Sequence, residues 1–195
     1  MMKEKKEKKK WGLILFLVFI MLGTTFSFVF FGFSPVTEKA KYNGLIFSFI
    51  PRDNIWIAKI NGKDAAFSFL PKDADDVLVF DDSFKMLEGR FEIDVTSDAN
   101  STFKEAIALA QHQMGLTLAQ YNIYVRKGFT ANSTFSLPVI ICKDATLIVP
   151  IVYFNYGNTT NIHVENNCII AEASSNADFI KVKDRLLYGI LGVMN

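Results

Sequence analysis

Residues 91–115 read FEIDVTSDANSTFKEAIALAQHQMG, and this stretch holds both kinds of element from which we expect the fold to be built. Residues 90–96 alternate polar and apolar side chains, as a half-buried strand does. Residues 101–120 change period and place apolar side chains at i, i+4, i+7 and i+11, which is one stripe of an amphipathic helix: Phe103, Ile107, Ala110 and Met114. A strand followed by such a helix predicts an α+β core.

Polar residues near position 100 are typical of the start of a helix. We expect Asn100 or Ser101 to cap it, and Glu105 suits the first turn because negative charge there favours the helix dipole. Gly115 is expected to weaken or end the helix. Residues 168–192 repeat the order strand, polar turn, amphipathic helix, glycine. Only a few positions match, so a duplicated unit stays open, and we favour coincidence.

The remaining outer sequence is rich in β-branched and aromatic runs, which predict strands. Asn61-Gly62 predicts a hairpin because both residues tolerate positive φ, and Pro150 is expected to place its strand at an edge or bulge. A last helix is predicted over residues 176–194, capped by Asn176. The other predicted strands are 45–50, 54–60, 63–70, 76–80, 121–127, 137–142, 145–154, 161–166 and 168–173.

These elements predict one α+β domain over residues 44–195. We expect a mixed or antiparallel sheet with about two amphipathic helices packed on one face, preceded by an N-terminal transmembrane helix. A domain of about 150 residues buries close to 70% of its unfolded surface, which is enough for one core. Residues 34–43 are polar and are expected to form a linker before this domain.

A long uncharged stretch, WGLILFLVFIMLGTTFSFVFFGF, runs from Trp11 to Phe33. As a helix it would be about 35 Å long, and the hydrocarbon core of a bilayer is about 30 Å thick. A buried core helix would be shorter or amphipathic. A cleaved signal peptide would have a shorter apolar region and a small-residue cleavage site. We therefore predict an uncleaved transmembrane signal anchor over residues 11–33, with the lipid bilayer as its partner.

Lysines directly before this stretch predict its orientation. A cytoplasmic excess of lysine and arginine sets topology, so we expect residues 1–10 to be a basic cytoplasmic tail and residues 38–195 to lie outside the plasma membrane. The lysines concerned are Lys3, Lys5, Lys6, Lys8, Lys9 and Lys10.

The net charge of +1 conceals an uneven distribution of charge. Residues 3–10 contain six lysines and two glutamates of the 21 basic and 20 acidic residues. The rest of the chain therefore has 15 basic and 18 acidic residues, a charge of −3. A folded body with this sign of charge is untypical of nucleic-acid-binding proteins, so we expect no nucleic-acid partner.

Two cysteines, Cys142 and Cys168, are expected to lie outside the membrane. A cysteine pair in such a compartment is usually oxidised, so we favour a disulfide over two buried free thiols. Three N-x-S/T triplets begin at Asn100, Asn132 and Asn158, all in predicted turns. They are possible glycosylation sites, although asparagine, serine and threonine are also ordinary turn residues.

No residue pattern in the chain identifies a reaction. His163 and Glu165 could face one side of a strand, and His112 lies on the polar flank of the predicted helix. Neither arrangement has the paired short spacings of zinc sites. The acidic residues between 73 and 82 lack the spacing of an EF-hand. We therefore expect no catalytic residue, no metal and no cofactor.

Residues 56–71, 140–173 and 184–194 together resemble a group of small signal-anchored archaeal proteins for which no activity is established. The shared pattern is a hairpin with Asn-Gly, a cysteine pair around two strands and a terminal helix with Tyr-x-x-x-Gly. The resemblance implies a location at the cell surface and a paired role for Cys142 and Cys168.

We consider three functions in order of preference. The first is a membrane-anchored binding or interaction module of the cell envelope, whose outer domain has a protein or surface polymer as partner. Aromatic residues in surplus, including those of the 129–136 loop, could form its contact surface. The second is a pilin-like structural surface subunit, and the third is an envelope enzyme or metal-binding protein that uses His163, Glu165 or the acidic residues.

Overall fold

The structure is a computed structural model that describes Phe16, Met21 and residues 38–80 and 83–194. The chain divides into two compact units, Met1–Val36 and Thr37–Asn195, and both sheets of the fold belong to the second. The lysines of the expected tail and nearly all of the expected membrane segment, 11–33, lie outside the described residues. No helix among the described residues is long and apolar enough to cross a membrane.

The second unit begins with a four-stranded antiparallel sheet in the order β1-β2-β3-β4. Asn43-Gly44 and Asn61-Gly62 turn the chain after the first and third strands, and all four residues have positive φ. Two-residue turns of this kind match the twist of paired strands. The strands are β1 (Lys39–Tyr42), β2 (Leu45–Ile50), β3 (Ile55–Ile60) and β4 (Lys63–Phe67).

A second, six-stranded sheet has the order β5-β9-β10-β8-β6-β7. Four neighbouring strands, β10, β8, β6 and β7, are parallel, whereas β9 runs antiparallel to β10. The strands are β5 (Leu78–Val79), β6 (Glu92–Ser97), β7 (Tyr124–Lys127), β8 (Ile151–Tyr156), β9 (Asn161–Glu165) and β10 (Cys168–Ala173).

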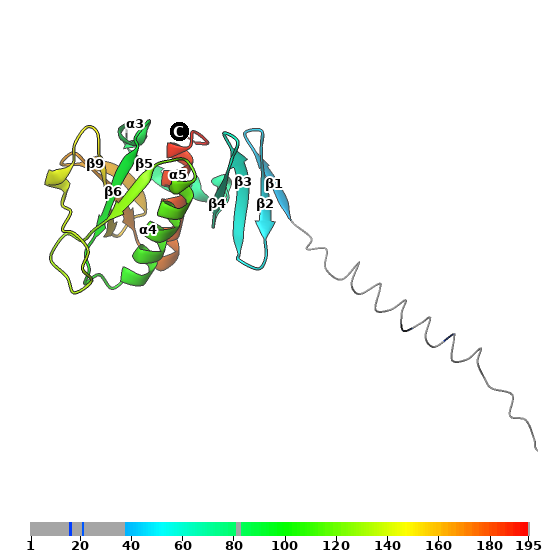
Figure 1. Ribbon diagram of the computed structural model, residues 1–195, viewed down its shortest axis with the longest axis horizontal. Coiled ribbons are helices and arrows are strands. Elements are labelled where there is room, and N and C mark those ends of the chain that lie inside the picture. Colours follow the sequence, from blue (N-terminus) through cyan, green and yellow to red (C-terminus); the bar gives the residue numbers. More distant parts are fainter. Residues whose placement is uncertain (1–15, 17–20, 22–37, 81–82, 195) are drawn as a thin grey trace, which may run out of the picture. The chain divides into compact units, whose positions relative to one another are not determined.

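Two long helices, α4 (Lys104–Ala119) and α5 (Asn176–Ile190), pack against each other and lie between the two sheets (Figure 1). On one side, Tyr188 of α5 stacks on Phe67 with ring centroids 4.3 Å apart. On the other side, α5 covers β10, and α4 lies against β6 and β7. One continuous cluster of buried apolar side chains joins both sheets through this helical layer. The shorter helices are α2 (Pro71–Ala74), α3 (Ser83–Leu87) and the 3-10 turn η1 (Cys142–Asp144).

The prediction of an α+β fold with mixed and antiparallel pairing is confirmed. The predicted arrangement of one sheet with helices on one face differs from the structure, which has two sheets with the helices between them. The expected linker, 34–43, contains β1, so the outer sheet starts before residue 44. The predicted helix over 101–120 is confirmed as α4 with its stripe buried, except that Phe103 is half-buried at the N-cap. Neither Asn100 nor Ser101 caps it as expected, because Phe103 is the N-cap residue and no side-chain hydrogen bond caps the helix. Gly115 lies inside this helix and does not end it.

Several predicted boundaries were wrong. Ser175, not Asn176, caps α5 through a hydrogen bond from the Asp178 backbone N–H to its hydroxyl. Residues 137–149 form no strand. Their only β-type pairing is the isolated bridge between Val139 and Phe129. Pro150 does not mark an edge, because it precedes the central strand β8 and its carbonyl accepts from Asp94 N.

Segment 129–150 instead covers the face of the six-stranded sheet that is turned away from the helices. Ile140 of this segment packs with Ile151, Cys168 and Ile170 in a second apolar cluster. The Thr96 hydroxyl donates a buried hydrogen bond of 2.8 Å to the Ile140 carbonyl. Burial on both faces explains why Ile93 to Ser97 of β6 are all buried, although this strand alternates polar and apolar residues.

Candidate functional site

A cavity of about 520 Å³ lies at the carboxyl ends of β6 and β7, beside the first half of α4. Ligands of sheets with parallel strands commonly bind outside these carboxyl ends. We call it the carboxyl-edge cavity and define it by its lining residues, which come from β6, α4, β7 and the segment after β7: Ser97, Ala99, Lys104, Glu105, Ala108, Gln111, Lys127, Phe129, Phe135 and Leu137.

Helix α4 supplies one wall because three of its residues recur on one face. Lys104, Ala108 and Gln111 are spaced at i, i+4 and i+7, which brings them into line along a helix. The helix itself is fixed by its buried stripe, whose members Ile107, Ala110 and Met114 are at most 2% exposed. The cavity wall that α4 forms is therefore fixed in position by the packing of α4 in the main apolar core.

The opposite wall is aromatic. Phe129 and Phe135 contact each other with ring centroids 5.7 Å apart and planes tilted by 44°. Phe129 is fixed by two backbone bonds, one from its N–H to Pro138 O at 3.0 Å and one from Ile140 N to its carbonyl at 2.8 Å. Phe135 is 62% exposed, so this wall is open to solvent at its outer end.

Two polar residues of the cavity lining are buried, Ser97 and Gln111, and Gln111 is the one with an unpaired side-chain atom among the described residues. The residue is only 5% exposed, and its Nε2 has no hydrogen-bond partner among the residues that the structure describes. Buried polar atoms normally have a partner, and leaving a donor unsatisfied costs about 1–3 kcal/mol. This unused donor distinguishes the carboxyl-edge cavity from a void in the core.

The charged groups around the cavity favour an anion. Two lysines, Lys104 and Lys127, and one glutamate, Glu105, line it. Lys127 Nζ lies 3.5 Å from His112 Nδ1, which holds the lysine side chain along α4. The formal charge of the lining is therefore +1.

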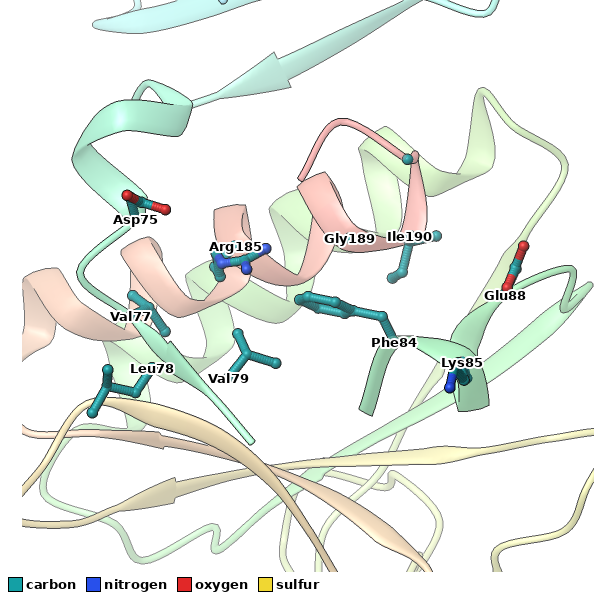
Figure 2. A pocket seen from close by; sticks show the side chains of 11 residues that line it. Asp75, Val77, Leu78, Val79, Phe84, Lys85, Glu88, Arg185, Gly189 and Ile190 are labelled. Carbon is teal, nitrogen blue, oxygen red and sulfur yellow. The ribbon is translucent and has the colours of Figure 1, made fainter. Parts of the chain in front are cut away.

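A larger cavity, of about 660 Å³, lies between α5, β5 and α3 (Figure 2). At its centre the Arg185 guanidinium lies 4.8 Å from the centroid of the Phe84 ring, and Figure 2 shows these two side chains close together above Val79. Burial lowers the pKa of Arg185, and the nearby carboxylate of Asp75 opposes that shift. Since the cation is already stacked on an aromatic ring, this site serves to pack α3 against α5.

Close packing at Gly189 supports this structural role. A Cβ atom there would lie 2.3 Å from the Phe84 ring, so only glycine lets the ring approach the helix. The charges around the cavity also balance, because two lining residues, Asp75 and Glu88, are acidic and two, Lys85 and Arg185, are basic. We therefore favour the smaller cavity as the functional site.

A buried ion pair joins α5 to the chain after β4. Lys183 and Asp184 are 1% and 0% exposed, and the Lys183 ammonium donates to Asp184 Oδ1. Asp184 Oδ2 accepts from the backbone N–H groups of Ser68 and Phe69, both at 2.8 Å. Tyr188 then donates its hydroxyl to the Phe69 carbonyl at 2.6 Å. This network fixes α5, in the helical layer, to the chain that leaves the four-stranded sheet.

The predicted pairing of Cys142 and Cys168 is confirmed by a disulfide in the structure, with Cα atoms 5.2 Å apart. It joins η1 to the start of β10. η1 belongs to segment 129–150, which we call the covering segment. The three candidate glycosylation residues, Asn100, Asn132 and Asn158, are all exposed.

Other residues named from the sequence do not come together as a catalytic group. His163 Nδ1 lies 2.7 Å from Asn161 Oδ1, and its Nε2 is 4.0 Å from Glu165. Asp76 pairs with Lys181 at 2.8 Å. Among the described residues, no three His, Cys, Asp or Glu side chains are placed to hold a metal ion.

No family model, curated protein or solved structure matches this chain. The resemblance to signal-anchored archaeal proteins stays a prediction. Function is therefore inferred from the geometry of the site and from the sequence.

Proposed function

We propose that residues 38–194 form a non-catalytic binding domain that receives an apolar group of its partner in the carboxyl-edge cavity. The observation that carries the proposal is the buried amide of Gln111 in the lining of this cavity. A concave, mostly apolar site with a few placed polar groups is typical of ligand binding. The cavity combines an aromatic wall for affinity with one amide and two ammonium groups for orientation.

The proposal includes a location at the outer face of a membrane. The uncharged stretch over residues 11–33 and the lysines before it support an anchor with a cytoplasmic N-terminus. The disulfide between Cys142 and Cys168 also supports this location, because such bonds persist in oxidising compartments.

Ala108→Trp tests the site. Ala108 lines the cavity and is exposed at its mouth, so an indole there should occupy the space that a ligand needs. We expect a set of small apolar and amphipathic compounds, observed by saturation-transfer NMR with the full chain, to bind the unmodified protein. The Ala108→Trp variant should keep its circular dichroism spectrum and lose most of this binding.

The matched control is Ala177→Trp, which adds the same indole to an exposed position in the first turn of α5, outside the cavity lining. It should bind as the unmodified protein does. Equal binding by both variants, or no binding by the unmodified protein, would contradict the proposed site.

The location is tested by the intact mass of the chain extracted from its native membranes, with free thiols alkylated before any reduction. We expect no alkyl addition, because Cys142 and Cys168 are joined. Sugar-sized increments at Asn100, Asn132 or Asn158 would further support an outward domain. Two alkyl groups and no added sugar would contradict the outward location.

A further inference from the structure

We infer that the carboxyl-edge cavity binds a small apolar monocarboxylate, aliphatic or aromatic, with its carboxylate at Gln111 and its apolar body against Phe129 and Phe135. This inference rests on the proposed function and adds the chemical class of the ligand. It follows from three features of the cavity: an unused buried donor, an excess of positive charge and an apolar wall.

The unused donor requires an acceptor. Gln111 Nε2 is buried without a partner among the described residues, and a ligand oxygen reaches it when the side-chain amide turns toward the cavity that Gln111 lines. A ligand oxygen at this point would remove the cost of the unsatisfied donor on binding. Carboxylate oxygens only accept hydrogen bonds, and bonds to a charged acceptor are about twice as strong as neutral ones.

The charges on the lining select an anion over a cation. Two basic residues, Lys104 and Lys127, and one acidic residue, Glu105, line the same space. A carboxylate there would gain attraction from both ammonium groups, whereas an amine would be repelled by them. A single negative charge matches the formal excess of one positive charge in the lining.

The rest of the ligand is expected to be apolar. The tilted pair of Phe129 and Phe135 offers ring faces and edges, and Leu137 and Ala108 add aliphatic surface beside it. Aromatic and aliphatic groups both pack well against such rings. The volume of about 520 Å³ is within the range of about 300–1,000 Å³ that is usual for small-molecule sites.

The test compares three probes of one shape: 4-phenylbutyrate, its neutral primary amide and 4-phenylbutylamine. Each is titrated calorimetrically into the full chain in phospholipid nanodiscs, with empty nanodiscs as the blank. We expect saturable binding of the carboxylate, with an affinity at least about tenfold higher than that of the amine, which corresponds to one charge-assisted hydrogen bond.

Gln111→Glu keeps the size of the side chain and replaces the amide donor by a second carboxylate. It should weaken binding of 4-phenylbutyrate at least about tenfold and reduce its preference over the amine. Gln120→Glu is the matched control, because Gln120 is an exposed glutamine at the end of the same helix. It should leave the affinity unchanged.

Gln111→Leu distinguishes a ligand-binding role of Gln111 from a role in stabilising the fold. Since leucine removes an unsatisfied buried donor, we expect the melting temperature to rise by about 2–4 °C while binding of the carboxylate is lost. A fall in melting temperature would assign Gln111 a structural role and overturn the inference.

The outcomes also distinguish the inference from the proposed function. If all three probes bind with similar affinity and Ala108→Trp abolishes that binding, the cavity is a binding site but the monocarboxylate class is wrong. If no probe binds, or if binding survives in Ala108→Trp, the inference fails. The proposed function fails if the wider set of compounds also does not bind, or if Ala108→Trp binds that set as well as Ala177→Trp does.

Discussion

Replacing Asp184 by alanine should lower the free energy of unfolding by about 3–5 kcal/mol, because it leaves the buried Lys183 ammonium without its counter-charge. The substitution also removes the acceptor for two backbone N–H groups, those of Ser68 and Phe69. Denaturant titration of the full chain, followed by circular dichroism, measures the loss.

Three further variants show whether the ion pair causes this effect. Lys183→Met should cost less than Asp184→Ala, since the remaining carboxylate keeps its two backbone donors. The double variant Lys183→Met/Asp184→Leu should recover part of the loss, as apolar replacements of buried ion pairs often do. Asp53→Asn, in an exposed turn, should change stability by less than about 0.5 kcal/mol. A loss below about 1 kcal/mol in Asp184→Ala would contradict the structural role of the pair.

Loss of the disulfide should cost about 3.5 kcal/mol by the chain-entropy relation, since Cys142 and Cys168 are 26 residues apart. The bond fixes the covering segment to β10, and Cys168 itself is buried in the second apolar cluster. The variant Cys142→Ala/Cys168→Ala should therefore unfold at a lower denaturant concentration than the oxidised protein.

Reduction of the unmodified chain by a phosphine provides the comparison. The reduced protein should have nearly the stability of the double alanine variant, and the variant should not respond to the reductant. If reduction leaves the unfolding midpoint of the unmodified chain unchanged, the disulfide is not a stabilising part of this fold.

The sequence predicted the elements whose signals are local. Asn61-Gly62 predicted its hairpin correctly because the flanking runs have clear strand composition. The same dipeptide at Asn43-Gly44 makes the same turn, but β1 reads KAKY and contains no β-branched residue, so its composition indicates a linker. β1 is a strand because it pairs with β2, and this pairing cannot be recognised from the sequence of β1 alone.

Residues 137–149 show the opposite error. Their β-branched composition predicted strands, yet Pro138 and Pro150 each lack a backbone N–H and interrupt any ladder. One of their apolar side chains, that of Ile140, is buried outside any strand, because it packs on the outer face of the six-stranded sheet. Leu147 and Ile148 are 83% and 77% exposed, so composition wrongly indicated the type of element and indicated burial correctly only at Ile140.

The carboxyl-edge cavity was not predicted, although part of its signal was present. Gln111 lies four residues after Ile107 and three before Met114, so it shares the buried side of the helix with the predicted stripe. A glutamine at such a position is unusual and could have been noticed. That β6 and β7 are parallel neighbours, and that Phe129 and Phe135 lie opposite α4, follow only from the tertiary fold.

The side-chain amide of Gln111 offers the most direct measurement of the central claim. The chain has three glutamines, Gln111, Gln113 and Gln120, so ¹⁵N labelling of glutamine amides gives three pairs of side-chain signals, and Gln111→Glu identifies one of them. When the full chain is titrated with 4-phenylbutyrate, the Gln111 pair should shift saturably while the Gln120 pair stays in place. A Gln111 signal that does not move at saturating probe, or equal shifts of all three pairs, would contradict ligand binding at the carboxyl-edge cavity.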